Sequence, residues 1–315
     1  MRSQDLDKLI KTRFSDIFDS AAEVYLSQVG RNTQDDELDL DSAGRPAVFI
    51  GLGGSGAKTI ARMKWRFRKM FPPSQYPHLH ESKRFIAIDT VDLDTLAGED
   101  PDGSEYIKKH LARDEYCALG AQIDPYAYVT EQLKNNEALA RWWDQRYTPP
   151  AKTLEAGAKR VRPLGRLALF KETDSGQNIR NKLNQAIQSV KQIQPQTGEA
   201  GRLVAVESTS VQVYIFSGTC GGTGSGMVWD ILSLCYGAIA SLNTQMTPLV
   251  RLFLFMPGTY ITLGQQRDKI LGKAYTANAF AFFKELSYLL SDASRLHELS
   301  AAGTRGIAHA VNPNW

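Results

Sequence analysis

The sequence predicts an α/β protein of three layers, in which a mostly parallel sheet is covered by helices on both faces. Apolar strand-like runs alternate with helix-like segments from Pro46 onward, and this alternation is typical of parallel sheets. Two of the apolar runs lead into glycine-rich turns that are followed by helices, the layout of a strand–turn–helix unit. The sequence contains no internal repeat and no low-complexity tract.

The elements follow from the apolar runs and their spacing. We expect strands at residues 48–50, 84–89, 212–216 and 249–257. We expect helices from about Ala57 through Phe71, from near Leu164, over about 226–242, and over 274–290, the last of them long. The region between Pro101 and Trp143 is polar and rich in helix-forming segments.

The domain organisation is predicted from shifts in composition. Residues 1–44 resemble an appendage, with helical spacing at 14–29 followed by a polar, acidic linker. Residues 45–296 form the main domain, with an insertion at about 97–150. Residues 297–315 are expected to be a C-terminal tail. Aromatic residues within the insertion are interpreted as packing residues.

Composition and charge restrict the class of protein. The chain has 315 residues, 43% of them hydrophobic, which is sufficient for a buried core, and its formal net charge of +3 calls for no nucleic-acid partner. The three cysteines, Cys117, Cys220 and Cys235, lack metal or redox spacing. The N-terminus has no apolar signal core, and the most apolar long segment contains Asp230. We expect a soluble cytoplasmic protein without a membrane segment.

The first glycine-rich turn, GLGGSG at 51–56, has four glycines in six residues and admits several kinds of site. A Walker A loop is disfavoured because Ala57 stands where the motif needs its lysine, and Lys58 comes one residue late. That slip turns the lysine by about 100° on the helix. A dinucleotide-binding loop remains open, since the turn satisfies G-x-G-x-x-G and Asp89 ends the next strand.

The second glycine-rich turn favours a different interpretation. Residues 218–226 read GTCGGTGSG, with five glycines in nine residues between an apolar strand and a helix. Backbone N–H groups in such a turn, aimed by the helix dipole, form a nest for an anion such as phosphate. Thr223 and Ser225 add hydroxyl donors. A dinucleotide site does not need a second phosphate loop this rich in glycine.

The second turn resembles the tubulin signature GGGTG[ST]G, and further segments resemble the same family in the family's order. These segments are GLGGSG, FIAIDTVDLDTL at 85–96, GAKRVRPLGRLAL at 157–169, MPGTY at 256–260 and YTANAFAFFKEL at 275–286. The family includes tubulins and the bacterial division protein FtsZ. The resemblance, over roughly residues 46–290, is closest to the large bacterial tubulin-like proteins. It implies a Rossmann-like, tubulin-type nucleotide-binding domain that ends in a long central helix.

The resemblance also implies a nucleotide site that takes GTP or GDP with Mg²⁺. The implied nucleotide-binding residues are Gly53, Gly54, Ser55, Gly56, Asp89, Thr90, Gly157, Ala158, Gly221, Gly222, Thr223, Gly224, Ser225, Pro257, Tyr275 and Asn278. Asn278 is expected to read the guanine edge, and Tyr275 to stack on the base. No direct protein ligand for the metal is implied, and Mg²⁺ is expected to be held through water, near Asp89.

The chain departs from the family pattern at several positions. Cys220 replaces the first glycine of the signature. Val91 stands where the family's second loop, which corresponds to residues 85–96 here, usually carries an aspartate. The family's third loop corresponds to the segment at 157–169 here. Lys159 and Arg160 add positive charge to this third loop, where FtsZ has small residues. We interpret Arg166 as an ion-pair or capping residue, and Phe280, Phe282 and Phe283 as core residues.

Three functions remain open at the level of sequence. The first is a tubulin-like protein that binds GTP and self-assembles into oligomers or filaments, or docks with a partner. Its hydrolysis would depend on an acidic loop that is not recognised in this chain, nor is the family's second domain. Catalytic residues are therefore unassigned. The second is a GTP-sensing module of a larger complex that does not hydrolyse GTP. The third is an NAD-binding oxidoreductase.

Overall fold

The computed structural model describes most of the chain after the N-terminal extension. The described residues are 43–99, 101–120, 123–149, 154, 157–175, 178–190, 192–195, 203–206, 210–241, 247–258, 260, 269–292 and 295. The predicted helix at 14–29, the acidic linker up to residue 42 and the tail at 297–315 lie outside the described residues.

A parallel five-stranded sheet forms the middle layer, as the sequence predicts. Its strand order is β3-β2-β1-β6-β7, and every neighbouring pair is parallel. The strands are β1 (Ala47–Leu52), β2 (Lys83–Asp89), β3 (Tyr116–Ala118), β6 (Ser210–Gly218) and β7 (Thr247–Phe255). A separate antiparallel pair is formed by β4 (Gln192–Pro195) and β5 (Leu203–Val206).

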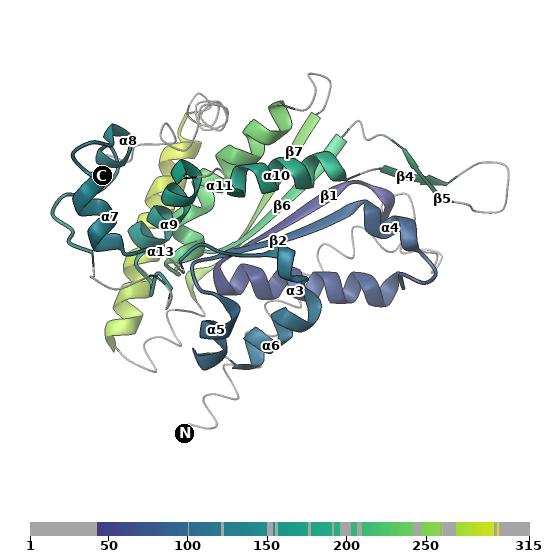
Figure 1. Ribbon diagram of the computed structural model, residues 1–315, viewed down its shortest axis with the longest axis horizontal. Helices are drawn as coiled ribbons and strands as arrows, with labels where there is room; N and C mark the ends of the chain where they lie inside the picture. The colour runs from purple at the N-terminus through teal and green to yellow at the C-terminus, as the bar shows by residue number, and fades with distance from the viewer. Residues whose placement is uncertain are drawn as a thin grey trace.

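Helices cover the sheet on both faces, and the predicted three-layer arrangement is confirmed (Figure 1). One group comprises α3 (Gly53–Met70), α4 (Pro77–Glu81), α5 (Leu93–Glu99) and α6 (Pro101–His110). The others are α7 (Pro125–Gln132), α8 (Glu137–Ala140), α9 (Arg162–Ser175), α10 (Asn178–Ser189), α11 (Thr223–Ala240) and α13 (Lys269–Leu290). None of the helices in the described part of the chain is both long enough and apolar enough to cross a membrane.

The central strand β1 contributes side chains to two hydrophobic cores, one on each face of the sheet. Val48 and Ile50 belong to a core that includes side chains of α9, α10 and α11. Ala47 and Phe49 belong to a second core with side chains of α3. Successive side chains of a strand point to opposite faces, so a strand covered on both sides is apolar throughout. All six residues of β1 are buried.

The predicted insertion at about 97–150 contributes to the core of the domain. β3 lies within it and pairs with β2 at the edge of the sheet. Trp143 is buried in the core that also contains side chains of α9 and α11. The interpretation of its aromatic residues as packing residues is therefore confirmed for Trp143.

The sequence assigned three phenylalanines of α13 to the hydrophobic core, and one of these assignments is wrong. Phe282 is fully buried, and Phe283 is partly buried against both cores. Phe280 is 66% exposed, so its assignment as a core residue is wrong. Residues 280 and 282 are two positions apart on the helix, about 200° around its axis, and cannot share its buried face.

Candidate functional site

The two glycine-rich turns lie at the point where the strand order of the sheet reverses direction. From β1 the chain adds β2 and β3 on one side, and it then returns to add β6 and β7 on the other. The turns follow β1 and β6, which are neighbours in the sheet. In open parallel sheets such a switch point, at the carboxyl ends of the strands, is where ligands bind.

Glycines allow these two turns to touch. Gly53 has φ of +67°, and a Cβ built on it would lie 3.2 Å from the backbone nitrogen of Gly224. A Cβ on Gly224 would lie 2.8 Å from the carbonyl oxygen of Leu52. Because neither glycine has a side chain, the first turns of α3 and α11 adjoin backbone to backbone.

Both helices present uncapped N-termini at this point. The N-cap residues, Leu52 for α3 and Gly222 for α11, make no side-chain capping hydrogen bond. Neither helix has an acidic residue in its first turn. Each helix is 18 residues long and brings the positive end of its dipole to the site. Two such N-termini together provide the donors and the potential that bind an anion.

A third loop packs against the second turn in an unusual backbone conformation. Gly157, Lys159 and Arg160 all have positive φ, of 84°, 41° and 68°. A Cβ on Gly222 would lie 2.9 Å from both the Cβ of Ala158 and the nitrogen of Arg160. Positive φ at two non-glycine residues is a strained arrangement that concentrates at functional sites. The exposed side chains of Lys159 and Arg160 add two cations beside the turn.

Thr90, which directly follows β2, links the three segments. Its hydroxyl oxygen lies 2.7 Å from that of Thr223, in a hydrogen bond shared between the two. The same oxygen accepts a hydrogen bond of 3.0 Å from the backbone N–H of Ala158. Its own backbone N–H donates to the carboxylate of Asp89 at 2.7 Å. The ends of β2, the third loop and α11 are thereby held together.

Asp89 brings a buried carboxyl group to the site. Burial raises its pKa to about 6, although hydrogen bonds from Thr90 and Thr223 act in the opposite direction. Its Oδ2 lies 3.9 Å from the position of a Cβ on Gly54, so it faces the first turn of α3. Within the described residues no group of three His, Cys, Asp or Glu side chains is placed to hold a metal ion. A single buried acid fits a metal that is held mainly by phosphate and water.

The raised pKa of Asp89 predicts that the free energy of unfolding falls between about pH 4 and pH 6. In this range the folded chain keeps the proton that the unfolded chain has lost, so rising pH favours unfolding, and the loss persists above the folded pKa. The gap between 3.8 and about 6 corresponds to at most about 3 kcal/mol. Asp89→Asn should remove this pH dependence and stabilise the nucleotide-free chain at pH 7. Urea unfolding at pH 4.5 and pH 7 measures the effect, and an unchanged pH dependence in the variant would contradict it.

Asn278 of α13 connects the third loop to the second turn. Its amide nitrogen donates to the carbonyl oxygen of Arg160 at 2.7 Å and to that of Cys220 at 2.8 Å. Both amide hydrogens are therefore used within the protein. The sequence assigned Asn278 a role in base recognition, and the structure adds this role in joining two loops.

Two tyrosines and one arginine line the side of the site nearest α13. The rings of Tyr260 and Tyr275 lie 6.1 Å apart, and the guanidinium of Arg160 lies 5.7 Å from the centre of the Tyr275 ring. The Tyr260 hydroxyl donates to the hydroxyl of Ser55 at 2.8 Å. Tyr260 was not singled out as a site residue, although it closes the MPGTY segment that the resemblance placed near the sugar.

Most of the residues assigned to the site from the sequence are brought together. Hydrogen bonds and close packing connect Gly53, Gly54, Ser55, Asp89, Thr90, Gly157, Ala158, Gly221, Gly222, Thr223, Gly224, Ser225, Tyr275 and Asn278. Gly56 lies behind them, packed on the carbonyl of Phe216. Pro257 lies just beyond β7, partly buried, and its role stays a prediction.

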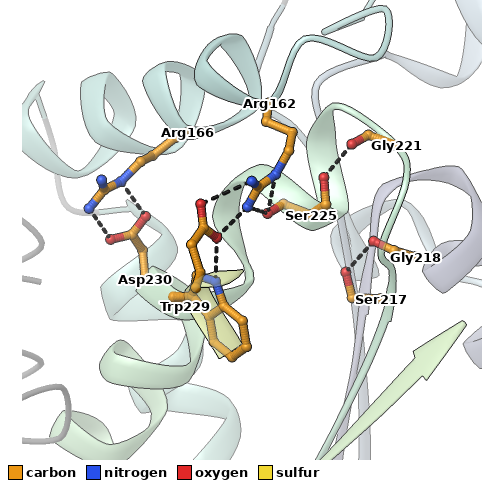
Figure 2. Close-up of polar contacts among 9 residues, drawn as sticks. Arg162, Arg166, Ser217, Gly218, Gly221, Ser225, Trp229 and Asp230 are labelled. Atoms are coloured by element: carbon orange, nitrogen blue, oxygen red, sulfur yellow. Dashed lines mark hydrogen bonds and ion pairs between the residues drawn. The ribbon is translucent and has the colours of Figure 1, made fainter. Parts of the chain in front are cut away.

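Arg166 forms the ion pair that the sequence suggested. Its guanidinium makes a two-point contact with the carboxylate of Asp230, with N–O distances of 2.9 and 3.0 Å (Figure 2). The guanidinium also lies 4.7 Å from the centre of the Trp142 ring. Arg166 therefore joins its own helix, α9, to α11 and to the predicted insertion, and its role is structural.

Comparison with known proteins identifies the family. A family model described as "Tubulin like" matches residues 48–310. No curated protein sequence matches the chain. Among solved structures, the chain is similar to CetZ2 from Haloferax volcanii in a GTPγS-bound protofilament, with 14% identity and a TM-score of 0.32. That alignment covers 82% of this chain and 59% of CetZ2. On the family match, which spans most of its length, this chain belongs to the tubulin-like family, within the tubulin/FtsZ superfamily.

Proposed function

We propose that this chain binds GTP and GDP at the site formed by the two glycine-rich turns and the third loop. The observation that carries the proposal is the meeting of two uncapped helix N-termini at the β1–β6 switch point. Phosphate is the anion that such a nest of backbone donors suits. Family membership supports a guanine nucleotide as the source of that phosphate.

Individual parts of the site suit successive phosphates. The first turns of α3 and α11 supply backbone donors to the inner phosphates. Gly157 and Ala158 approach the terminal phosphate, and Lys159 and Arg160 supply charge beside it. Mg²⁺, bound by phosphate oxygens and water near Asp89, would neutralise part of the phosphate charge.

Base selection follows from the hydrogen bonds of Asn278. Because both of its amide hydrogens go to backbone carbonyls, only the amide oxygen is offered to a base. Guanine presents two neighbouring N–H donors on its Watson–Crick edge, whereas adenine presents a ring acceptor at the equivalent position. An isolated acceptor therefore favours guanine over adenine. The Tyr275 ring is available to stack on the base.

The proposed function also includes assembly of the chain and hydrolysis of the bound nucleotide. We propose that the nucleotide-bound chain self-associates or docks with a partner protein. Side chains on α13 that are exposed in this structure suit such a contact, since Phe280 is 66% and Leu290 63% exposed. Hydrolysis depends on an acid that positions the attacking water, and a neighbouring subunit or a further domain would supply it.

Gly221 offers a direct test of the phosphate site. A Cβ on Gly221 would meet no atom of the described residues within 4 Å, so Gly221→Ala should fold with wild-type stability. If the space is taken by phosphate, the methyl group should weaken GTP and GDP binding by about tenfold or more. Nucleotide titration and thermal unfolding of both chains measure the two quantities. Wild-type affinity in the folded variant would place the phosphates elsewhere.

A further inference from the structure

A buried ion-pair network lies next to the second glycine-rich turn, whose residues Cys220–Ser225 are called the phosphate turn below (Figure 2). Arg162, at the start of α9, pairs with Glu285 of α13, and both side chains are nearly buried. The Arg162 guanidinium also donates to the carbonyl oxygen of Ser225 at 2.9 Å. The indole N–H of Trp229 donates to Glu285 at 2.8 Å, which fixes the carboxylate. Three helices thus meet on one guanidinium.

Ser225 transmits this contact to the turn itself. Its hydroxyl donates back to the carbonyl oxygen of Gly221. Within the part of the chain that the structure describes, no atom lies within 4 Å of a Cβ built on Gly221, so packing by these residues does not hold Gly221 on its open side. The position of the Gly221 peptide therefore depends on Ser225, and the carbonyl of Ser225 is held by Arg162.

Helix α13, which carries Glu285, also contacts the other end of the phosphate turn. Asn278 of α13 donates to the carbonyl oxygen of Cys220. Asn278 and Glu285 are seven residues apart, which is close to two helical turns, so both lie on one face of α13. Through these two residues α13 contacts the turn at Cys220 directly and at Ser225 by way of Arg162.

We propose that Arg162 and Glu285 are positioning residues that set the phosphate turn at Cys220–Ser225 for its ligand. With Asn278 they make the position of α13 a determinant of phosphate affinity. The role rests on the proposed binding of guanine nucleotides at this site. Neither residue touches the ligand; each acts through Ser225. Arginine is needed here because its planar fork reaches the carboxylate and the carbonyl at once, which a lysine ammonium cannot do in the same geometry.

The neighbouring ion pair provides a matched control. Arg166 and Asp230 join α9 to α11 one turn further on, with a two-point contact between side chains that are also nearly buried. Both pairs line the same cavity of about 230 Å³. Asp230 lies four residues beyond the first turn of α11, at 223–226, to which Ser225 belongs, and its carboxylate accepts its described hydrogen bonds from Arg166. Asp230→Asn therefore perturbs the same helices without the link to Ser225.

The test compares Arg162→Lys and Glu285→Gln with Asp230→Asn in the full chain. Affinities for GTP, GDP and guanosine are measured by titration or competition. Both network variants should bind GTP and GDP about tenfold more weakly, because one charge-assisted contact is lost. Guanosine, which has no phosphate, should bind each network variant as it binds wild type. Asp230→Asn should keep wild-type affinity for all three ligands.

Amide hydrogen exchange of the nucleotide-free chains tests the same inference independently of binding. The network variants should speed exchange of the first hydrogen-bonded amides of α11, at 226–229, relative to its second half, at 231–240. Asp230→Asn should leave that ratio unchanged. An unchanged ratio in the network variants, or equal losses for GTP and guanosine, would overturn the positioning role. A wild-type chain that binds no guanine nucleotide would refute the proposed function, while the exchange ratio would still decide the role of Arg162.

Discussion

Gly56→Ala is expected to destabilise the chain by more than about 3 kcal/mol and to prevent stable folding. A Cβ on Gly56 would lie 2.4 Å from the carbonyl oxygen of Phe216 and 2.8 Å from the carbonyl carbon of Gly51. Both are backbone atoms of central strands, and neither can move without displacing the sheet. The first turn of α3 would have to leave β1 and β6, and with it the site.

Gly54→Ala is the matched control for this prediction. Gly54 lies in the same turn, yet among the described residues its Cβ would meet only the Asp89 carboxylate, at 3.9 Å, which is an ordinary contact. This variant should fold with stability within about 1 kcal/mol of wild type, since alanine is also the better helix former. Circular dichroism during thermal unfolding distinguishes the two chains. A Gly56→Ala chain as stable as the Gly54→Ala chain would mean that α3 does not pack this closely on the sheet.

Asn278→Ala is expected to produce the largest loss of nucleotide affinity, on the order of 100-fold for GTP. The change removes the acceptor proposed for the guanine edge. It also leaves the carbonyl oxygens of Arg160 and Cys220 without the donor that joins the two loops. Base recognition and loop positioning would fail together, so the effect should exceed that of a variant that touches either alone.

Asn278→Asp separates the two roles. The carboxylate keeps an acceptor for guanine but has no hydrogens for the two backbone carbonyls. Affinity for guanosine should then fall less than affinity for GTP. Titration of each variant with both ligands measures the difference. If Asn278→Ala bound GTP as tightly as wild type, the residue would have neither role.

The sequence predicted the fold because its strongest signals are local. Buried strands such as 48–50 and 84–89 appear as continuous apolar runs, and both glycine-rich turns follow such a run directly. The helices after the turns begin earlier than expected, at Gly53 and Thr223 instead of about Ala57 and Gly226. Glycine is a poor helix former, so propensity argued for a later start. Close packing of the two first turns overrides that preference.

Elements that depend on distant partners were harder to predict. β3 has only three residues, too few to stand out as an apolar run in the sequence, and it pairs with β2 at the edge of the sheet. The pair formed by Arg162 and Glu285 joins residues 123 positions apart, and no local pattern marks either one. The exposed position of Phe280 follows from which face of α13 is covered, which the helical spacing of three nearby phenylalanines does not determine.

The third loop illustrates the same limit within the site. Its resemblance to the family identified Gly157 and Ala158, and the positive charge of Lys159 and Arg160 was visible in the sequence. Their positive φ was not, because lysine and arginine seldom adopt it. Hydrogen bonds from Ala158 to Thr90 and from Asn278 to Arg160 tie the loop to residues distant in the sequence, which no local pattern predicts.

The most direct test of the central claim is a calorimetric titration of the wild-type chain with GTP, GDP, ATP and NAD in the presence of Mg²⁺. The proposed site predicts binding of GTP and GDP with one nucleotide per chain, and at least about tenfold weaker binding of ATP and NAD. Binding of NAD in preference to GTP would contradict the account and restore the dinucleotide interpretation of the first glycine-rich turn.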